Sequence, residues 1–85
     1  MFRVAIPSFN RSKILANTTI KLLINGGIRK CYIFLPSDQV VDYMQQLDHL
    51  DIKIEYCITP KQGIGNVRNY IRDYFDIGTK VFMID

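Results

Sequence analysis

The sequence has little of what builds disulfide frameworks, membrane spans or strongly charged surfaces. Two cysteines, Cys31 and Cys57, allow at most one bridge and no metal cluster. The apolar runs, such as residues 31–35 and 81–84, are far shorter than the roughly 20 residues that a membrane helix needs. The 11 basic and 8 acidic residues give a net charge of +3, which does not by itself mark a nucleic-acid binder. A composition that is 48% apolar also excludes a disordered chain.

Histidine and targeting signals are scarce as well. His49 is the only histidine and lies in the polar stretch 45–51, where we expect an exposed side chain rather than a catalytic base. Both cysteines lie in strand-like runs and are expected to be buried free thiols. The first residues run directly into a strand-like pattern, so we expect no signal or transit peptide and no membrane partner. The expected compartment is therefore the reducing cytoplasm.

Strand-like and helix-like patterns alternate along the 85 residues, which we expect to form one domain spanning 1–85. Short apolar runs predict strands at 2–6, 32–35, 52–59 and 80–84. Periodic apolar positions predict helices at 13–24, at 37–47 and from the turn at 61–65 to residue 75.

The helix ends and faces can also be predicted. We expect Asn10 or Ser12 to cap the first helix, Ser37 to cap the second, and the glycines at 26–27 to end the first in a left-handed conformation. The apolar residues of the second helix that we expect to point inward are Val40, Val41, Tyr43, Met44 and Leu47.

This β-α-β-α-β-α-β alternation predicts a three-layer, Rossmann-like α/β fold with a parallel sheet and right-handed crossovers. We expect the strand order 3-2-1-4, in which the first and fourth strands meet where the order reverses and ligands bind outside the carboxyl ends. The fourth strand would then be an apolar edge, which favours marginal solubility or self-association through that strand.

The loop at 61–69 is the most informative candidate binding segment. Gly63 and Gly65 permit positive φ and close approach of a ligand, and the helix that follows directs free N–H groups at an anion. Lys61 and Arg68 add positive charge that suits a phosphate. The segment lacks the third glycine of a dinucleotide fingerprint and the Gly-Lys-Ser/Thr of a P-loop. An ordinary strand-to-helix turn is the alternative interpretation.

Three further candidates follow other strands. After the first strand, Ser8 and Asn10 can hydrogen-bond a base or ribose, Phe9 can stack, and Arg11 can reach a phosphate. The alternative is a capped turn with a packed aromatic ring. Asp38, after the second strand, can accept a hydrogen bond from a base or ribose, although a residue in the first turn of a helix often only complements the dipole. All these loops belong to one edge of the predicted sheet.

The fourth strand ends on Asp85. A carboxylate there can bind a divalent cation that joins the protein to a diphosphate. The alternative is a terminal residue with no role.

Three stretches together resemble a known enzyme family. Residues 4–11, Val-Ala-Ile-Pro-Ser-Phe-Asn-Arg, resemble the opening strand and loop of GT-A glycosyltransferases of the family-two type. Residues 63–69 resemble their glycine-rich turn and Ala-Arg-Asn helix, with Val67 in the Ala place. Residues 82–85 resemble the strand that runs into the metal-binding Asp-x-Asp motif. The opening loop is most similar to phage and large-virus TET-associated glycosyltransferases, which are linked to sugar transfer onto hydroxymethylated pyrimidines in DNA.

The resemblance implies the N-terminal half of a GT-A domain, in the host cytoplasm if the chain is viral. A UDP-sugar would be the donor, modified DNA the acceptor of the complete enzyme, and Mn²⁺ or Mg²⁺ the cofactor. Pro7, Ser8, Asn10 and Arg11 would line the nucleotide pocket; Arg68 would approach the diphosphate and Asp85 would bind the metal. The second Asp and the acceptor half are missing from the sequence, so we expect a truncated chain that binds a nucleotide-sugar weakly and transfers nothing.

Two other functions stay open. One is a non-enzymatic module, perhaps a split gene product, that binds a nucleotide or another subunit. The other is a receiver-like signalling domain, which the sequence disfavours because receivers place paired acidic residues where this chain has residues 7–10, Pro-Ser-Phe-Asn.

Overall fold

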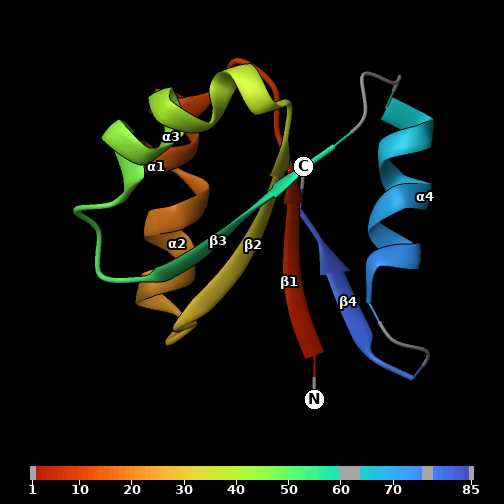
Figure 1. The fold of residues 1–85 in the computed structure, drawn as a ribbon. Coiled ribbons are helices and arrows are strands. Elements are labelled where there is room, and N and C mark those ends of the chain that lie inside the picture. Colours follow the sequence, from red (N-terminus) through yellow and green to blue (C-terminus); the bar gives the residue numbers. More distant parts are fainter. Residues whose placement is uncertain (1, 60–63, 76–77, 85) are drawn as a thin grey trace.

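The computed structural model describes residues 2–59, 64–75 and 78–84, with the side chains of residues 2 and 64–68 left outside that description. Strands and helices alternate along the chain (Figure 1). The strands are β1 (Phe2–Pro7), β2 (Lys30–Leu35), β3 (Lys53–Ile58) and β4 (Lys80–Met83). The helices are α1 (Ser12–Asn17), α2 (Thr19–Asn25), the 3₁₀ turn η1 (Ser37–Gln39), α3 (Val40–Leu47) and α4 (Ile64–Tyr74). None of the described helices is long and apolar enough to cross a membrane.

The strands form one parallel sheet in the order β3-β2-β1-β4, which confirms the predicted order. The two central strands, β1 and β2, contain most of the buried strand residues, as expected of parallel strands that are covered on both faces. In β2, every residue in 31–35 is buried, and these side chains alternate between the two faces of the sheet.

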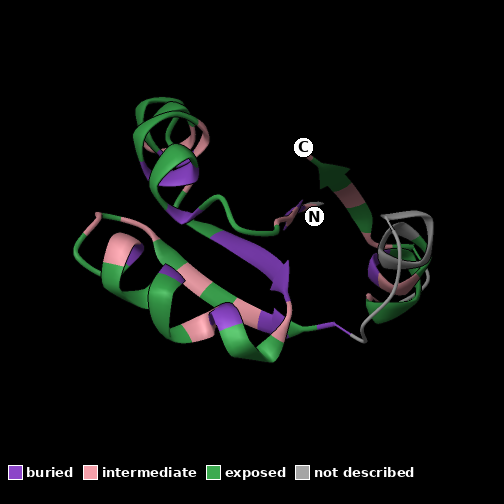
Figure 2. Ribbon diagram, turned by 90° about the horizontal axis from the view of Figure 1, so that it is seen from above, coloured by how far each residue is buried: buried purple, intermediate pink, exposed green. Residues whose placement is uncertain are grey.

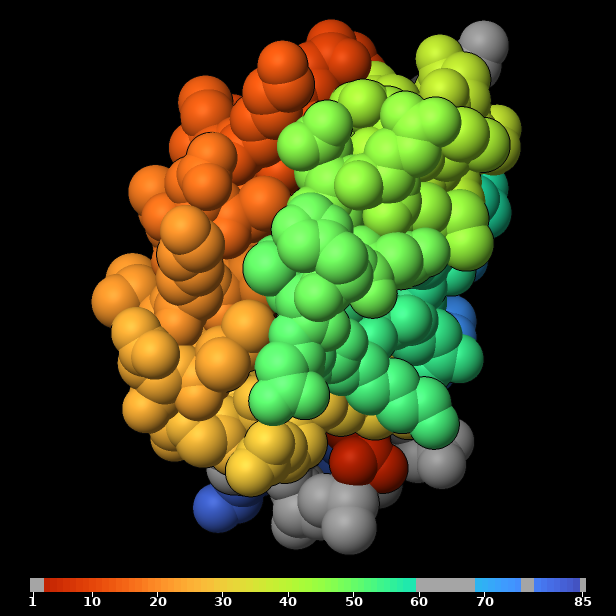
Figure 3. All heavy atoms as spheres, turned by 90° about the vertical axis from the view of Figure 1, so that its left-hand side faces the viewer, coloured from red at the N-terminus to blue at the C-terminus, as the bar shows by residue number. Residues whose placement is uncertain are grey.

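Helices cover both faces, so the predicted three-layer arrangement is confirmed (Figures 1 and 2). The first two crossovers step in one direction along the sheet, and right-handed connections therefore put α1, α2 and α3 on the same face. The third crossover returns past β1 to β4 and puts α4 on the opposite face. Figure 3 shows α1 and α2 (orange) lying beside α3 (green) over the first face.

The core consists of two buried clusters, one for each face. Under α1–α3 the cluster contains Val4, Ile6, Leu15, Ala16, Ile20, Cys31, Ile33, Leu35, Tyr43 and Leu47. Under α4 it contains Ala5, Tyr32, Phe34, Cys57 and Ile71. Both thiols are free and buried, as predicted, and His49 is exposed, as predicted.

The prediction of a single helix at 13–24 is wrong, because this segment forms two helices that are separated at Thr18. This residue has φ −122° and ψ −84°, and its hydroxyl donates to the carbonyl of Ile14 at 2.6 Å. A β-branched residue with such a back-bonding hydroxyl is a poor helix former and often bends a helix. Two short helices, α1 and α2, result.

The predicted helix caps are also wrong at three positions. Arg11 is the N-cap of α1, with no side-chain capping bond. Ser12 is already inside the helix, where its hydroxyl donates to Asp42 Oδ2 at 2.6 Å, and Asn10 precedes the N-cap with φ 54°. Ser37 begins the η1 turn, and Gln39 is the N-cap of α3. Tertiary contacts outweigh local capping here.

The prediction of which α3 residues point inward is correct in part. Tyr43 and Leu47 are fully buried and Val40 is half-buried. Val41 and Met44 are 65% and 40% exposed, because only one face of α3 packs against α1 and the sheet. The apolar stripe of this helix is therefore narrower than its composition indicates.

Candidate functional site

The candidate site lies at the carboxyl ends of the strands, where the strand order reverses between β1 and β4. At this point the N–H of Ile84, just after β4, donates to the carbonyl of Ala5 at 3.0 Å. Figure 1 shows that α1, α3 and α4 all begin at this end of the sheet. This is the edge at which open α/β sheets bind ligands.

The loop between β1 and α1, residues 8–11 (the β1 loop), is held in place by one buried tyrosine. The ring of Tyr43 is 0% exposed, and its hydroxyl shares a 2.6 Å hydrogen bond with Ser8 Oγ. The same hydroxyl accepts a 3.0 Å hydrogen bond from the N–H of Arg11. One side chain of α3 therefore links the two ends of the β1 loop.

A second contact determines the turn in the middle of the loop. The N–H of Asn10 donates to Gln39 Oε1 at 2.8 Å, and the Gln39 side chain is almost fully buried. Asn10 has φ 54°, a left-handed conformation that Asn adopts more readily than most residues. Because Gln39 ends η1, this bond brings the loops after β1 and β2 together.

The structure brings the predicted residues of these two loops to one edge. Phe9 is 62% exposed, and Asn10, Arg11 and Asp38 are exposed, so these side chains are accessible to a ligand. The Ser8 hydroxyl shares a hydrogen bond with Tyr43, which gives Ser8 a part in holding the loop. Pro7 ends β1 half-buried and pairs with Phe34.

The remaining predicted site residues lie partly or wholly outside the residues that the structure describes. Gly63 and Asp85 lie outside the described residues, as does Lys61. Gly65 and Arg68 lie in the first turns of α4, but their surroundings are outside the described part. Among the described residues, no three His, Cys, Asp or Glu side chains gather as a possible metal group.

Three residues of this edge were missed as site residues: Tyr43, Gln39 and Asp42. From the sequence, Tyr43 can be predicted only as an apolar position of a helix, and Gln39 and Asp42 only as ordinary polar residues. Their hydrogen bonds join positions 29 to 35 residues apart, and no local pattern encodes such pairs.

The thiols do not provide a nucleophile. Burial raises the pKa of Cys31 to about 12, and burial also raises the pKa of Cys57, although a Tyr74 hydrogen bond acts in the opposite direction. The thiolate is the reactive form, so both cysteines are inert near neutral pH. The exposed side chains on the described part of this edge, Phe9, Asn10, Arg11 and Asp38, can stack, hydrogen-bond and bind charged groups.

Comparisons with protein-family models, with the curated proteins and with the solved structures find no significant match to this chain.

Proposed function

We propose that this chain is the nucleotide-sugar-binding half of a metal-dependent GT-A glycosyltransferase with a UDP-hexose-like donor. The observation that carries the proposal is the position of the β1 loop. This loop resembles the nucleotide loop of the family, and polar contacts from α3 and η1 hold it against the loop after β2, at the carboxyl ends of the strands. A ligand that approaches this edge meets an ordered loop, which reduces the entropy lost on binding.

The exposed side chains of this edge suit the parts of a nucleoside diphosphate. Phe9 would stack on the base, and Asp38 would accept a hydrogen bond from the base or ribose. Arg11 would pair with the diphosphate, since a guanidinium binds phosphate oxygens in a bidentate fork. The resemblance adds Gly63, Gly65 and Arg68 at the start of α4, where N–H groups favour an anion.

The divalent cation in this proposal rests on the resemblance alone. Asp85 would be one of its ligands, and the described residues offer no group that completes a metal site. When bound, such an ion would neutralise the charge on the leaving diphosphate. The acceptor that the resemblance suggests is a hydroxymethylated base of DNA.

Calorimetric titration of the full 85-residue chain tests this proposal. We expect weak binding of UDP-glucose that strengthens with Mn²⁺ and exceeds the binding of UMP, without sugar transfer. Phe9→Ala and Arg11→Gln should each weaken binding about tenfold, because each removes a contact worth roughly one to three kcal/mol. The controls, Leu22→Ala and Arg72→Gln, change exposed residues of α2 and α4 in the same way and should have no effect.

Nucleotide binding that is indifferent to both Mn²⁺ and the sugar would assign the chain to the non-enzymatic nucleotide-binding class. A complete lack of nucleotide binding would overturn both assignments. Robust sugar transfer by the chain alone would contradict the expectation that it only binds the donor.

A further inference from the structure

A hollow of about 190 Å³ opens at the end of the sheet opposite the candidate site. It is bounded by the first residues of β1 and β2 and by the loop at 27–29 that precedes β2. The ladder between these strands begins at Ala5 and Tyr32, so the earlier residues of both strands lie outside it. Figure 1 shows β1 and β2 diverging toward this end. The hollow occupies the opening between them.

The described residues that line the hollow include three cations and no carboxylate. The cations are Arg3, Arg29 and Lys30. Tyr32 also lines it, and Lys30 Nζ lies 4.9 Å from the centroid of the Tyr32 ring. Lys53 pairs with Lys30 in register on the neighbouring strand and adds a fourth positive charge nearby. Four positive charges therefore gather at this end of the sheet.

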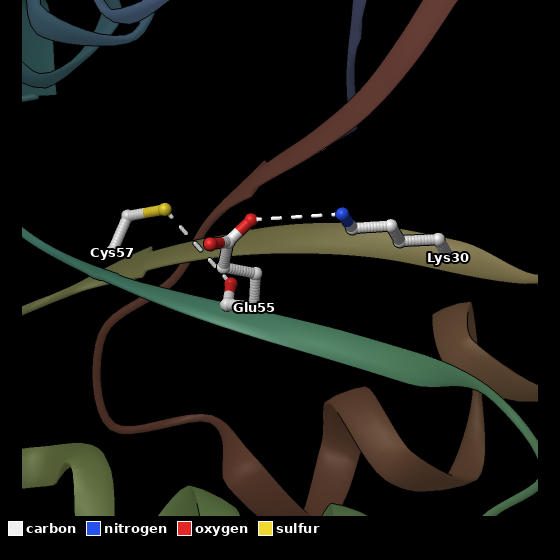
Figure 4. A network of polar contacts seen from close by, with 3 residues as sticks. All are labelled: Lys30, Glu55 and Cys57. Carbon is white, nitrogen blue, oxygen red and sulfur yellow. Dashed lines mark hydrogen bonds and ion pairs between the residues drawn. The ribbon is translucent and has the colours of Figure 1, made fainter.

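The nearby carboxylates compensate this charge only weakly. Glu55 Oε2 lies 3.8 Å from Lys30 Nζ, with 42% and 50% of the Lys30 and Glu55 side chains exposed (Figure 4). Asp51 Oδ2 lies 3.8 Å from Arg29, and both of those side chains are more than four-fifths exposed. Water and salt screen such long, exposed pairs.

Arg3 differs from the other two cations. It is partly buried, and its guanidinium has no hydrogen bond or ion pair with any residue in the described ranges. A guanidinium without a carboxylate partner can instead bind an anion, which its planar fork of N–H groups suits. Of the three cations that line the hollow, Arg3 therefore has no ion-pair partner among the described residues, whereas Arg29 and Lys30 each have a weak one.

The backbone of the loop contributes shape rather than hydrogen bonds. The N–H groups of Gly27 and Ile28 donate to the carbonyls of Ile24 and Leu23, so they are not free to bind a ligand. Gly27 has φ +83°, and a Cβ there would meet nothing within 4 Å, so the wall is open beside it. The backbone N–H groups of these two residues are therefore not available to an anion in the hollow.

From this arrangement we propose that the hollow binds the phosphate group of a small molecule, held by Arg3, Arg29 and Lys30. Its volume is below the ~300–1,000 Å³ of pockets that enclose drug-sized ligands, which leaves room for one phosphate with its water. The phosphate is either free or the terminal group of a phosphomonoester whose remainder extends into solvent. This site is separate from the proposed nucleotide site and does not depend on it.

Amide NMR of the full chain tests the proposal, with phosphate added at constant ionic strength. Inorganic phosphate and glycerol 3-phosphate are the two probes, and the tighter one identifies the source. We expect saturable shifts at the amides of Gly27, Arg29 and Lys30, with no saturable shift at residues 8–11. Arg3→Gln and Arg29→Gln should each raise the dissociation constant about tenfold, the loss expected for one charge-assisted hydrogen bond.

The matched control is Lys13→Gln, which removes one exposed positive charge from α1 at the opposite end of the sheet. It should leave the dissociation constant within about twofold of the original value. Arg29 is so exposed that its substitution will not unfold the chain, and the test therefore does not depend on how Arg3→Gln folds. Shifts that do not saturate, or equal weakening by Lys13→Gln and Arg29→Gln, would overturn the proposal. So would tighter binding of a twelve-nucleotide oligothymidylate than of either probe, since that identifies diffuse attraction to a polyanion.

Discussion

Tyr43 combines a completely buried ring with a hydroxyl that serves two partners on the β1 loop. Its ring fills the core under α3, while its oxygen lies 2.6 Å from Ser8 Oγ and 3.0 Å from the Arg11 nitrogen. Buried polar atoms are costly unless they are paired, and this pairing joins the packing of the core to the conformation of the loop.

We expect Tyr43→Phe to lower the free energy of unfolding by about 1–2 kcal/mol, since it leaves the Ser8 hydroxyl and the Arg11 N–H without their partner. Hydrogen exchange at the Arg11 amide should accelerate, because that N–H loses its acceptor. Urea denaturation and amide exchange provide the measurements. Tyr56→Phe is the control: its hydroxyl donates to Asp48 in an exposed 3.0 Å bond, and its loss should cost about 0.5 kcal/mol or less. Equal losses in the two variants would contradict this role of Tyr43.

The buried Cys31 thiol makes the stability of the chain depend on pH in the alkaline range. Its pKa is about 12 in the folded chain against 9.0 as the ordinary value, because burial disfavours the thiolate. Above pH 9 the unfolded thiol loses its proton while the folded one keeps it, so this contribution is complete below pH 9 and is lost as pH rises toward 12.

The expected result is a fall in the free energy of unfolding between pH 9 and pH 11 that is shallower in Cys31→Ala. The difference in slope should be at most about 1.4 kcal/mol per pH unit, the limit for one proton. Urea titrations at half-unit pH steps measure it, and below pH 8.5 the two curves should run parallel. Parallel curves up to pH 11 would show that Cys31 does not titrate with folding.

At the scale of elements, the end of α2 is formed by a complete Schellman motif. The N–H of Ile28 donates to the Leu23 carbonyl at 2.9 Å, and the N–H of Gly27 donates to the Ile24 carbonyl at 3.1 Å. The residue between helix and loop in this motif must be left-handed, and Gly27 meets that demand with φ +83°. The two adjacent glycines therefore have different roles.

Gly27→Ala should destabilise the chain by about 1 kcal/mol or more, because the new Cβ is strained at positive φ even though it meets no atom within 4 Å. Gly26→Ala is the matched control. Gly26 has φ −83°, and its added Cβ would lie 3.4 Å from the nearest atom, the Leu22 carbonyl oxygen. This variant should stay within about 0.5 kcal/mol of the original chain by thermal or urea unfolding. A larger loss at Gly26 than at Gly27 would contradict the assignment of the motif.

At the scale of the whole molecule, the helices cover the sheet unevenly. The helices α1–α3 lie over the strands on the β3 side, and β4 forms one edge of the described sheet. On β4, Phe82 and Met83 are 61% and 38% exposed. An apolar edge strand of this kind is a site where a second chain can pair.

We therefore expect the chain to self-associate through β4 at high concentration. Met83→Lys should lower the association constant at least tenfold, since a charge on an edge strand opposes pairing while the long side chain keeps its head in water. Sedimentation from micromolar to millimolar chain measures the effect. Val41→Lys, which changes another exposed apolar residue on α3, should leave association unchanged. A chain that stays monomeric throughout this range would contradict the expectation.

Much of the fold followed from local patterns. The apolar runs indicated four strands, and the helices between them required parallel pairing with right-handed crossovers, which leaves few strand orders. The Gly27 conformation and the buried thiols followed from residue type and immediate neighbours. The break at Thr18 and the exposure of Val41 did not, because back-bonding and partial coverage depend on what packs nearby.

By itself, the sequence determined the order of the elements, the topology of the sheet and the end at which its polar loops gather, since hydrophobic periodicity is a local signal and crossovers between parallel strands are nearly always right-handed. Only the tertiary structure decided that Tyr43 and Gln39 hold the β1 loop and that β1 and β2 diverge around Arg3. These features join residues about 30 positions apart. Their geometry depends on how α3 packs against the sheet and on where the ladder between β1 and β2 ends. The spacing of residues within one segment of the sequence encodes neither.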